Sequence, residues 1–466
     1  PSSWSSTARS SPAPEPAPEP VSAPPPLVSP PAVPPPVYQP PEPSRPVINW
    51  EQFMGAKLFA WLGGLALFLG VAFFVKYSFE HDLIPPEVRV SLGFLLGLGL
   101  IVGGLWIPRV RYAITAQTLV GSGVVSLYAV TFACNSIYHF AFFGPGATFL
   151  LMTLVTSTAF VLAVRLEAQA VALLGLLGGF LTPVLLSTGQ DNPVGLFGYV
   201  ALLDLGLAAV ALHRRWLYLV PLAAFGTVVM IVGWADHFLT PGSASVAMVV
   251  CTGFSVFFYA LCVVARRLGQ SSVELLGSAL GLTAVGFGFA LHFVQEPAVA
   301  AGAGRFLGYL AAIDLVVLAL VWLDERLNQA HAISGIVVFG LLAFWINEAL
   351  TDALLPWALG AALGFAALHA VFPIVLRQRR PEMTTAWWSQ LFPPLSLLLM
   401  LIPLFRLEAP PLLVWPAVLL VDLLAVGLAL VTYSIIAVGV VLVLTLVATA
   451  VCLFRVSPAV AVATCA

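Results

Sequence analysis

The stretch 194–212, VGLFGYVALLDLGLAAVAL, decides the fold. It contains 19 residues, and Asp204 is the one Asp, Glu, Lys, Arg or His among them. A helix of this length measures about 28 Å, close to the ~30 Å hydrocarbon core of a bilayer. Its residues are apolar all round, whereas a transmembrane β-strand alternates apolar and polar residues. The stretch therefore predicts a membrane-spanning α-helix.

Similar stretches follow one another through the rest of the chain. Of its 466 residues, 60% are hydrophobic and 9% are charged, whereas a soluble domain carries about 25% charged residues. We predict an all-α polytopic membrane protein with about fifteen transmembrane helices. The expected spans are 58–76, 88–107, 113–138, 146–164, 168–187, 194–212, 216–237, 243–264, 273–294, 303–323, 330–350, 354–376, 388–405, 411–432 and 434–454.

Residues 1–46 form a separate domain, because they hold 18 of the 37 prolines. Proline lacks a backbone N–H and fixes φ, so we predict a disordered or polyproline tail ahead of the multispanning domain, 47–466. The tail is expected to be a tether. The alternative is a ligand for a proline-recognition domain of a cytoplasmic partner.

Arginine marks one side of the membrane. The breaks after the even-numbered spans carry most of the arginines, and the odd-numbered breaks carry few. Positive residues collect on the cytoplasmic side, so these breaks and the tail are expected to be cytoplasmic. The arginines concerned are Arg109, Arg111, Arg165, Arg214, Arg215, Arg266, Arg267, Arg326, Arg377, Arg379 and Arg380. The opposite side is acidic.

Three spans share a pattern that ends in aspartate followed by leucine. The aspartates are Asp204, Asp314 and Asp422, separated by 110 and 108 residues, or four spans each time. We therefore predict tandem four-helix units inserted in the same direction. The last unit stops soon after Pro458, and the first residue is proline, so the chain is expected to be a fragment of a longer protein.

Several motifs resemble a known family. They are Trp50-Glu51-x-x-Met54-Gly55-x-Lys57, Trp61-x-Gly63, Phe74-x-Lys76-Tyr77, Ile84-Pro85-Pro86-x-x-Arg89, Gly121-x-Gly123 and Gly178-Gly179-Phe180-Leu181-Thr182-Pro183. From about residue 50 to the end, the chain resembles the bacterial family of predicted multispanning membrane proteins called domain of unknown function 2339. The resemblance implies a protein of the bacterial inner membrane and carries over no catalytic residues.

The strongest candidate site residues are Asp204, Asp314 and Asp422. Each lies near the middle of its span, where an aspartate costs about 2.5–3.5 kcal/mol to insert. A carboxyl group there suits a proton or cation relay. The alternative is a packing role, in which each neutral carboxyl group hydrogen-bonds a neighbouring helix, for instance through Tyr199 or Tyr309.

A second set of candidates would break helices. We expect Gly178, Gly179, Thr182 and Pro183 to interrupt the span 168–187, and Pro393 and Pro394 to interrupt 388–405. Interruptions free backbone groups and mark the substrate site in several transporter folds. The alternative is a kink whose freed groups are satisfied by neighbouring helices.

A third set lies at the acidic side, where Asp82, Glu87, Arg89 and His237 could bind a ligand or a lipid headgroup. No metal site is expected, because His139, His237 and His292 show no HxxxH or HExxH spacing. No cofactor is expected either, since phosphate-binding and nucleophile motifs are absent. The net charge of −2 gives no basis for binding nucleic acid.

Three functions fit these features. The leading hypothesis is translocation of a small solute, an ion or a lipid-linked molecule. The first alternative is a membrane enzyme acting on a lipid-linked envelope precursor through the acidic-side residues. The second is a non-catalytic scaffold whose tail recruits cytoplasmic partners. Apart from membrane lipid and such a partner for the tail, no partner is predicted.

Overall fold

A computed structural model of the chain describes residues 84–187, 189–380, 387–406, 413–432 and 436–455, and the single positions 66, 69, 70, 73 and 77. The predicted tail, most of the span 58–76 and Asp82 lie outside these residues. The chain divides into two units, Pro1–Leu83 and Ile84–Ala466, and the helices described below belong to the second.

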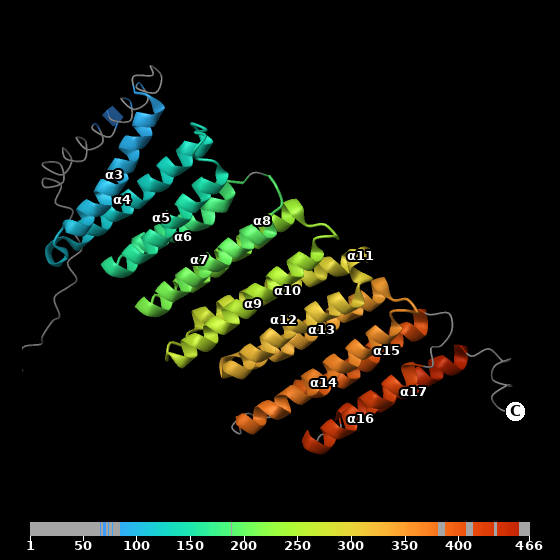
Figure 1. Ribbon diagram of the computed structural model, residues 1–466. Coiled ribbons are helices and arrows are strands. Elements are labelled where there is room, and N and C mark those ends of the chain that lie inside the picture. The colour runs from blue at the N-terminus through green and yellow to red at the C-terminus, as the bar shows by residue number, and fades with distance from the viewer. Residues whose placement is uncertain are drawn as a thin grey trace, which may run out of the picture. The chain divides into compact units, whose positions relative to one another are not determined.

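Every regular element in the described ranges is a helix (Figure 1). The helices coincide with all the predicted spans that the structure describes, to within a few residues. They are α3 (Pro86–Trp106), α4 (Arg109–Ser136), α5 (Pro145–Leu166), α6 (Gln169–Leu185), α7 (Pro193–Arg214), α8 (Leu219–Phe238), α9 (Ala244–Arg267), α10 (Val273–Gln295), α11 (Pro297–Ala300), α12 (Ala303–Leu323), η2 (Glu325–Leu327), α13 (Asn328–Ala349), α14 (Leu355–Arg379), η3 (Trp387–Leu391), α15 (Phe392–Arg406), α16 (Val414–Thr432) and α17 (Ile436–Arg455).

Twelve of the described helices are long and apolar enough to cross a membrane. Two shorter apolar segments, Gln169–Leu185 and Ala437–Cys452, occupy further predicted spans. Large apolar side chains remain exposed along these helices, for example Leu150 at 70% and Val249 at 72%. An apolar surface of this extent is costly to expose to water and stable in contact with lipid hydrocarbon. The chain is therefore a multi-pass membrane protein.

Consecutive helices run in opposite directions through short connections, so alternate breaks meet at the same end. At the arginine-rich ends, Arg214 Nη1 lies 2.8 Å from Glu167 Oε1. Further along the chain, Arg380 Nη2 donates to the Trp322 carbonyl at 2.9 Å. These contacts join breaks that are about 50 residues apart or more, as the predicted alternation requires.

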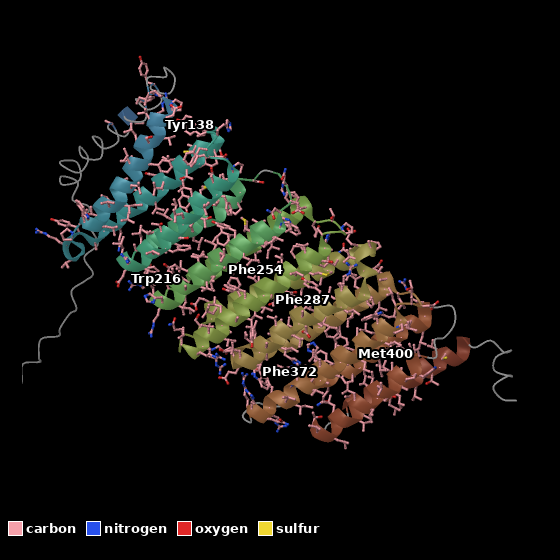
Figure 2. The ribbon with its side chains drawn as sticks, in the orientation of Figure 1. Tyr138, Trp216, Phe254, Phe287, Phe372 and Met400 are labelled. Atoms are coloured by element: carbon pink, nitrogen blue, oxygen red, sulfur yellow. The ribbon has the colours of Figure 1, made fainter. Side chains whose placement is uncertain are left out.

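The opposite helix ends, which we call the acidic ends, are joined in the same way. The indole Nε1 of Trp234 donates to Asp191 Oδ1 at 2.8 Å. Arg305 Nη1 donates to Ser245 Oγ at 3.2 Å, across 60 residues of chain. Side chains of the described helices fill the spaces between neighbouring ribbons (Figure 2).

Glycine lets α3 and α4 approach closely. A Cβ at Gly123 would lie 2.6 Å from the Gly97 carbonyl oxygen, so only glycine fits there. Small residues at helix contacts allow this backbone approach in membranes, where packing rather than the hydrophobic effect drives association. The Gly121-x-Gly123 motif is therefore partly a packing motif of this helix pair.

The structure corrects the predicted interruption at Gly178, Gly179, Thr182 and Pro183. Helix α6 is continuous through these residues and ends at Leu185, so the span is shortened rather than broken. Proline at 183 removes the donor that would reach the Gly179 carbonyl. The Tyr199 hydroxyl donates to that carbonyl at 2.9 Å, which supplies the missing hydrogen bond from α7.

The second predicted interruption lies at a helix start. Pro393 and Pro394 are the second and third residues of α15, directly after the 3₁₀ turn η3. Backbone N–H groups in the first turn have no helical acceptor, so proline is tolerated there. The span 388–405 therefore changes from 3₁₀ to α geometry at this point instead of unwinding in its middle.

Candidate functional site

Each of the three predicted aspartates meets a hydroxyl group on the next helix. Asp204 is the twelfth of 22 residues in α7, and Asp314 is the twelfth of 21 in α12. The hydroxyl donors are Thr227 Oγ1 to Asp204 Oδ2 at 2.6 Å, Ser334 Oγ to Asp314 Oδ1, and Thr445 Oγ1 to Asp422 Oδ1 at 2.9 Å. One contact therefore recurs in the pairs α7–α8, α12–α13 and α16–α17.

The two tyrosines proposed as partners of the aspartates donate their hydrogen bonds to other helices instead. Tyr199 and Tyr309 lie five residues before Asp204 and Asp314, which turns them by about 140° around the helix. Tyr309 accordingly donates to the Gly286 carbonyl on α10 at 2.7 Å, as Tyr199 donates to α6. Tyrosine and aspartate therefore fix opposite sides of the same helix.

Asp314 has a second partner, for which the described residues show no equivalent at Asp204 or Asp422. His369 Nε2, from α14, lies 3.1 Å from Asp314 Oδ2, and both side chains are fully buried. The distance is that of an ion pair once the ring is protonated, although the ring N–H is not aligned for a hydrogen bond. Asp204, which is 1% exposed, has no such neighbour, and its Oδ1 has no hydrogen-bond partner among the described residues.

A second histidine extends the group toward the arginine-rich ends. The rings of His331 and His369 lie 5.0 Å apart between centroids. His331 is the fourth residue of α13, and its Nδ1 accepts a hydrogen bond from Trp388 Nε1 in η3 at 3.2 Å. Asp314, His369, His331 and Trp388 therefore form a line from the middle of α12 to the first turn of α13; we call it the Asp–His cluster.

Aromatic rings enclose the Asp–His cluster. Phe372, labelled in Figure 2, stacks on His331 at 5.4 Å, and Phe392 lies 4.8 Å from the His369 ring. A Cβ at Gly335 would lie 2.3 Å from the Phe392 ring, so glycine lets α13 and α15 close over the histidines. This enclosure removes water from an ionisable pair, which raises the cost of any uncompensated charge.

A proline lies beside the same histidine. Pro373 is inside α14, four residues after His369, so the His369 carbonyl loses its helical N–H donor. Freed backbone groups at membrane depth are tolerated where they are buried in protein or line a cavity. Pro183 of α6 therefore has a counterpart in Pro373 of α14, and both helices continue through their proline.

The sequence prediction missed His331 and His369. The available signal was their position: both lie in the apolar spans 330–350 and 354–376, where an ionisable residue is costly. Recognising them as partners of Asp314 requires knowing that α12, α13 and α14 contact one another. The sequence spacing alone does not contain that information.

The predicted helix-breaking residues of α6 belong to a separate polar group. Thr182 Oγ1 donates to the Gly178 carbonyl at 2.7 Å. A Cβ at Gly178 would meet the Tyr128 ring at 2.3 Å, and the Tyr128 hydroxyl bonds Thr156 Oγ1 at 2.6 Å. These contacts hold α4, α5 and α6 together and include no carboxylate or histidine.

The acidic-side candidates lie on separate helices. Glu87 and Arg89 are in the first turn of α3, which packs against α4 (Figure 1). His237 is near the end of α8, with its side chain 71% exposed and its Nδ1 3.3 Å from Asp236 Oδ2. Among the described residues, no three or more His, Cys, Asp or Glu side chains are arranged so that they could hold a metal ion.

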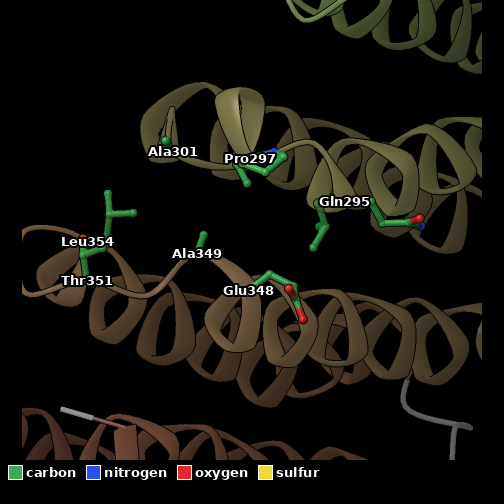
Figure 3. Close-up of a pocket in the computed structure, with 9 residues that line it drawn as sticks. Gln295, Pro297, Ala301, Glu348, Ala349, Thr351 and Leu354 are labelled. Carbon is green, nitrogen blue, oxygen red and sulfur yellow. The ribbon is translucent and has the colours of Figure 1, made fainter.

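A pocket opens at the acidic ends of α10, α11, α13 and α14 (Figure 3). It has a volume of about 440 Å³, and Gln295, Glu348 and Thr351 contribute its polar groups. The ring of Phe306 stacks on that of Trp345 at 6.1 Å, and Trp345 is only 1% exposed. Phe306 precedes Asp314 by eight residues in α12, and Trp345 precedes the pocket residue Glu348 by three in α13, so the two rings lie between the level of the pocket and that of Asp314.

Comparisons with known proteins agree with the helical architecture. No curated protein matches the chain, and no solved structure does. A family model described as "Predicted membrane protein (DUF2339)" matches residues 55–466, which include every helix described above. On this match and the membrane-spanning helices together, the chain belongs to the DUF2339 family of predicted membrane proteins.

Proposed function

We propose that the protein is a translocator of a small solute or ion, and that it binds and releases a proton at the Asp–His cluster. The observation that carries this proposal is the contact between Asp314 and His369, two fully buried ionisable side chains 3.1 Å apart inside a bundle of apolar helices. Ionisable residues at this depth are costly, and they are typical of proton relays and ion pathways.

The chemistry of the cluster suits proton transfer. A carboxyl group and an imidazole exchange a proton over a hydrogen-bond distance. The net charge of the pair is the same before and after the proton moves from one group to the other. His331 supplies the next ring toward the arginine-rich ends, 5.0 Å away between centroids. A proton therefore has three titratable side chains in sequence along this route.

The other half of the route is apolar. The stacked Phe306 and Trp345 rings separate Asp314 from the pocket that Glu348 and Gln295 line. We propose that, in the conformation of this structure, protons reach the Asp–His cluster from the arginine-rich ends. Solute would enter at the pocket after the Phe306 and Trp345 rings separate. Alternating access of this kind needs a fixed site near the membrane centre, and the position of Asp314 meets that need.

The experiment is a proton-flux assay with the purified chain in liposomes that enclose a pH-sensitive dye, with the membrane potential clamped. After an external acid step, vesicles containing the protein should acidify faster than protein-free vesicles. Asp314→Asn and His369→Gln should return the rate to that of protein-free vesicles. Asp204→Asn is the matched control and should keep the wild-type rate. Equal rates for wild type and Asp314→Asn would exclude the cluster from proton movement.

A scaffold role is the second candidate, and a specific observation favours it. At Asp204 and Asp422 the hydroxyl contact resembles a packing device repeated between neighbouring helices. Deletion of residues 1–46 separates the two functions. A scaffold loses its activity in cells without the tail, whereas proton flux in liposomes persists.

A further inference from the structure

A second feature, separate from the Asp–His cluster, is a groove between the parallel helices α9 and α12. Its volume is about 570 Å³, and its lining is almost entirely apolar. Met248, Val249 and Gly253 contribute from α9, and Tyr309 forms part of the α12 side. Val249 is 72% exposed, so the groove opens on the surface that faces lipid.

One cation lies at the end of this groove. Arg305 is the third residue of α12 and lines the groove together with Ser245, the second residue of α9. Its Nη1 donates to the neutral Ser245 hydroxyl at 3.2 Å, and the structure gives it no ion pair among the described residues. Arg305 is exposed, and it belongs to the acidic ends, where cations are few. Its charge is therefore available to an anion.

The depth of these groups indicates the ligand. The first turn of a spanning helix lies at the level of the lipid headgroups, whereas Gly253 is eight residues, or about 12 Å, further into the membrane. A Cβ at Gly253 would meet no atom within 4 Å, so this part of the groove is unfilled by protein. A phospholipid matches this arrangement, because its phosphate lies at the level of Arg305 and its hydrocarbon chain at the deeper level of Gly253.

We propose that this groove is a binding site for an anionic phospholipid of the phosphatidylglycerol type, with its phosphate on Arg305 and one acyl chain along Val249 and Gly253. A zwitterionic headgroup carries its own ammonium, which already compensates the phosphate. A net anionic headgroup is compensated by the guanidinium instead, and phosphate oxygens suit the planar donors of arginine.

The test is native mass spectrometry of the whole chain in detergent, titrated with phosphatidylglycerol, with phosphatidylethanolamine and with inorganic phosphate. We expect one phosphatidylglycerol to bind at least tenfold more tightly than phosphatidylethanolamine. Inorganic phosphate at millimolar concentration should not displace it, because phosphate lacks the acyl chain. Displacement by phosphate at that concentration would overturn the acyl-chain part and with it the proposal.

Variants separate the two halves of the site. Arg305→Gln should remove the preference for phosphatidylglycerol. Gly253→Leu should weaken the binding of both lipids, because its side chain fills the groove without meeting protein. The matched controls are Arg266→Gln, an exposed arginine at the other helix end, and Gly288→Leu, an exposed glycine with open space on α10. Lipid selectivity that survives Arg305→Gln, or that is lost equally in Arg266→Gln, would refute the site.

Discussion

Asp204 and Asp314 occupy matching positions in their helices but differ in what depends on them. The Thr227 hydroxyl lies 2.6 Å from Asp204 and also 3.0 Å from the Ala223 carbonyl of its own helix. Because a hydroxyl has one proton, Thr227 keeps an acceptor even when the carboxyl group is gone. The described residues offer Ser334 and His369 no such substitute, so both lose a neighbour when Asp314 is removed.

This difference predicts unequal costs of the same substitution. Asp314→Leu should lower stability by about 2–5 kcal/mol, because the buried Ser334 hydroxyl loses its hydrogen bond and the buried His369 imidazole loses the carboxylate beside it. Asp204→Leu should cost at least about 1 kcal/mol less, since Thr227 can donate to Ala223. Thermal unfolding in detergent measures both. Equal losses would show that leucine's size at these sites, rather than the unpaired partners, sets the cost.

The asparagine variants report whether the charge matters. Asp204→Asn keeps the size of the side chain and an acceptor for Thr227, so the unfolding temperature should be nearly that of wild type. Asp314→Asn also keeps the size of the side chain, but it removes the carboxylate that faces His369 Nε2 at 3.1 Å, so it should lower the unfolding temperature more than Asp204→Asn does. Equal unfolding temperatures for the two asparagine variants would mean that the charge of Asp314 does not stabilise its contact with His369.

At the scale of helices, the apolar runs predicted the described membrane spans to within a few residues, but not the short elements α11, η2 and η3. A hydrocarbon layer of fixed thickness selects runs of about 20 residues, so run length alone defines the spans. What the runs could not predict is which neighbouring group satisfies a backbone carbonyl that a proline leaves without its helical donor. Pro183 leaves α6 intact because Tyr199, on another helix, satisfies the freed carbonyl. The same limitation hid the Asp–His cluster, whose members come from α12, α13, α14 and η3.

The four-helix repeat stays a prediction. An aromatic contact joins an aspartate-bearing helix to the next in two places, but its geometry differs: Phe197 packs edge-to-face on Trp234 at 5.5 Å, whereas Phe306 stacks on Trp345 at 6.1 Å. Superposition of residues 194–294 on 303–405 is the measurement that decides whether these units are equivalent. A different helix order in space would make the recurrence a coincidence.

The contact between α3 and α4 gives a prediction for a helix pair. Gly123→Ala should destabilise the protein by about 1–3 kcal/mol, because the new methyl group meets the backbone of Gly97 and cannot be relieved by a side-chain rotation. Gly99→Ala in α3 is the matched control, since its Cβ would meet no atom within 4 Å. Unfolding temperature in detergent distinguishes them. Equal, small effects would mean that the two helices separate at little cost.

At the scale of the whole molecule, the arginine pattern defines two ends of the described helices. The contacts Arg214–Glu167 and Arg380–Trp322 join breaks at one end, and Trp234–Asp191 joins breaks at the other. The arginine-rich end is expected to face the cytoplasm, because positive loops are retained there. The tail 1–46 is expected on that same side. Protease added to intact cells should therefore leave the tail uncut.

Labelling of single cysteines tests this topology at two described positions. Arg266 and Asp352 are both exposed, and α10, α12 and α13 separate them. Three crossings place the two residues on opposite sides of the membrane. In a background whose native cysteines are replaced by alanine, a membrane-impermeant maleimide should label Asp352→Cys in intact cells. It should label Arg266→Cys only after the membrane is opened. Labelling of both from one side would show that one of the three helices does not cross. The reversed pattern would keep the crossings but invert the protein, and the Asp–His cluster would then exchange protons with the outer side.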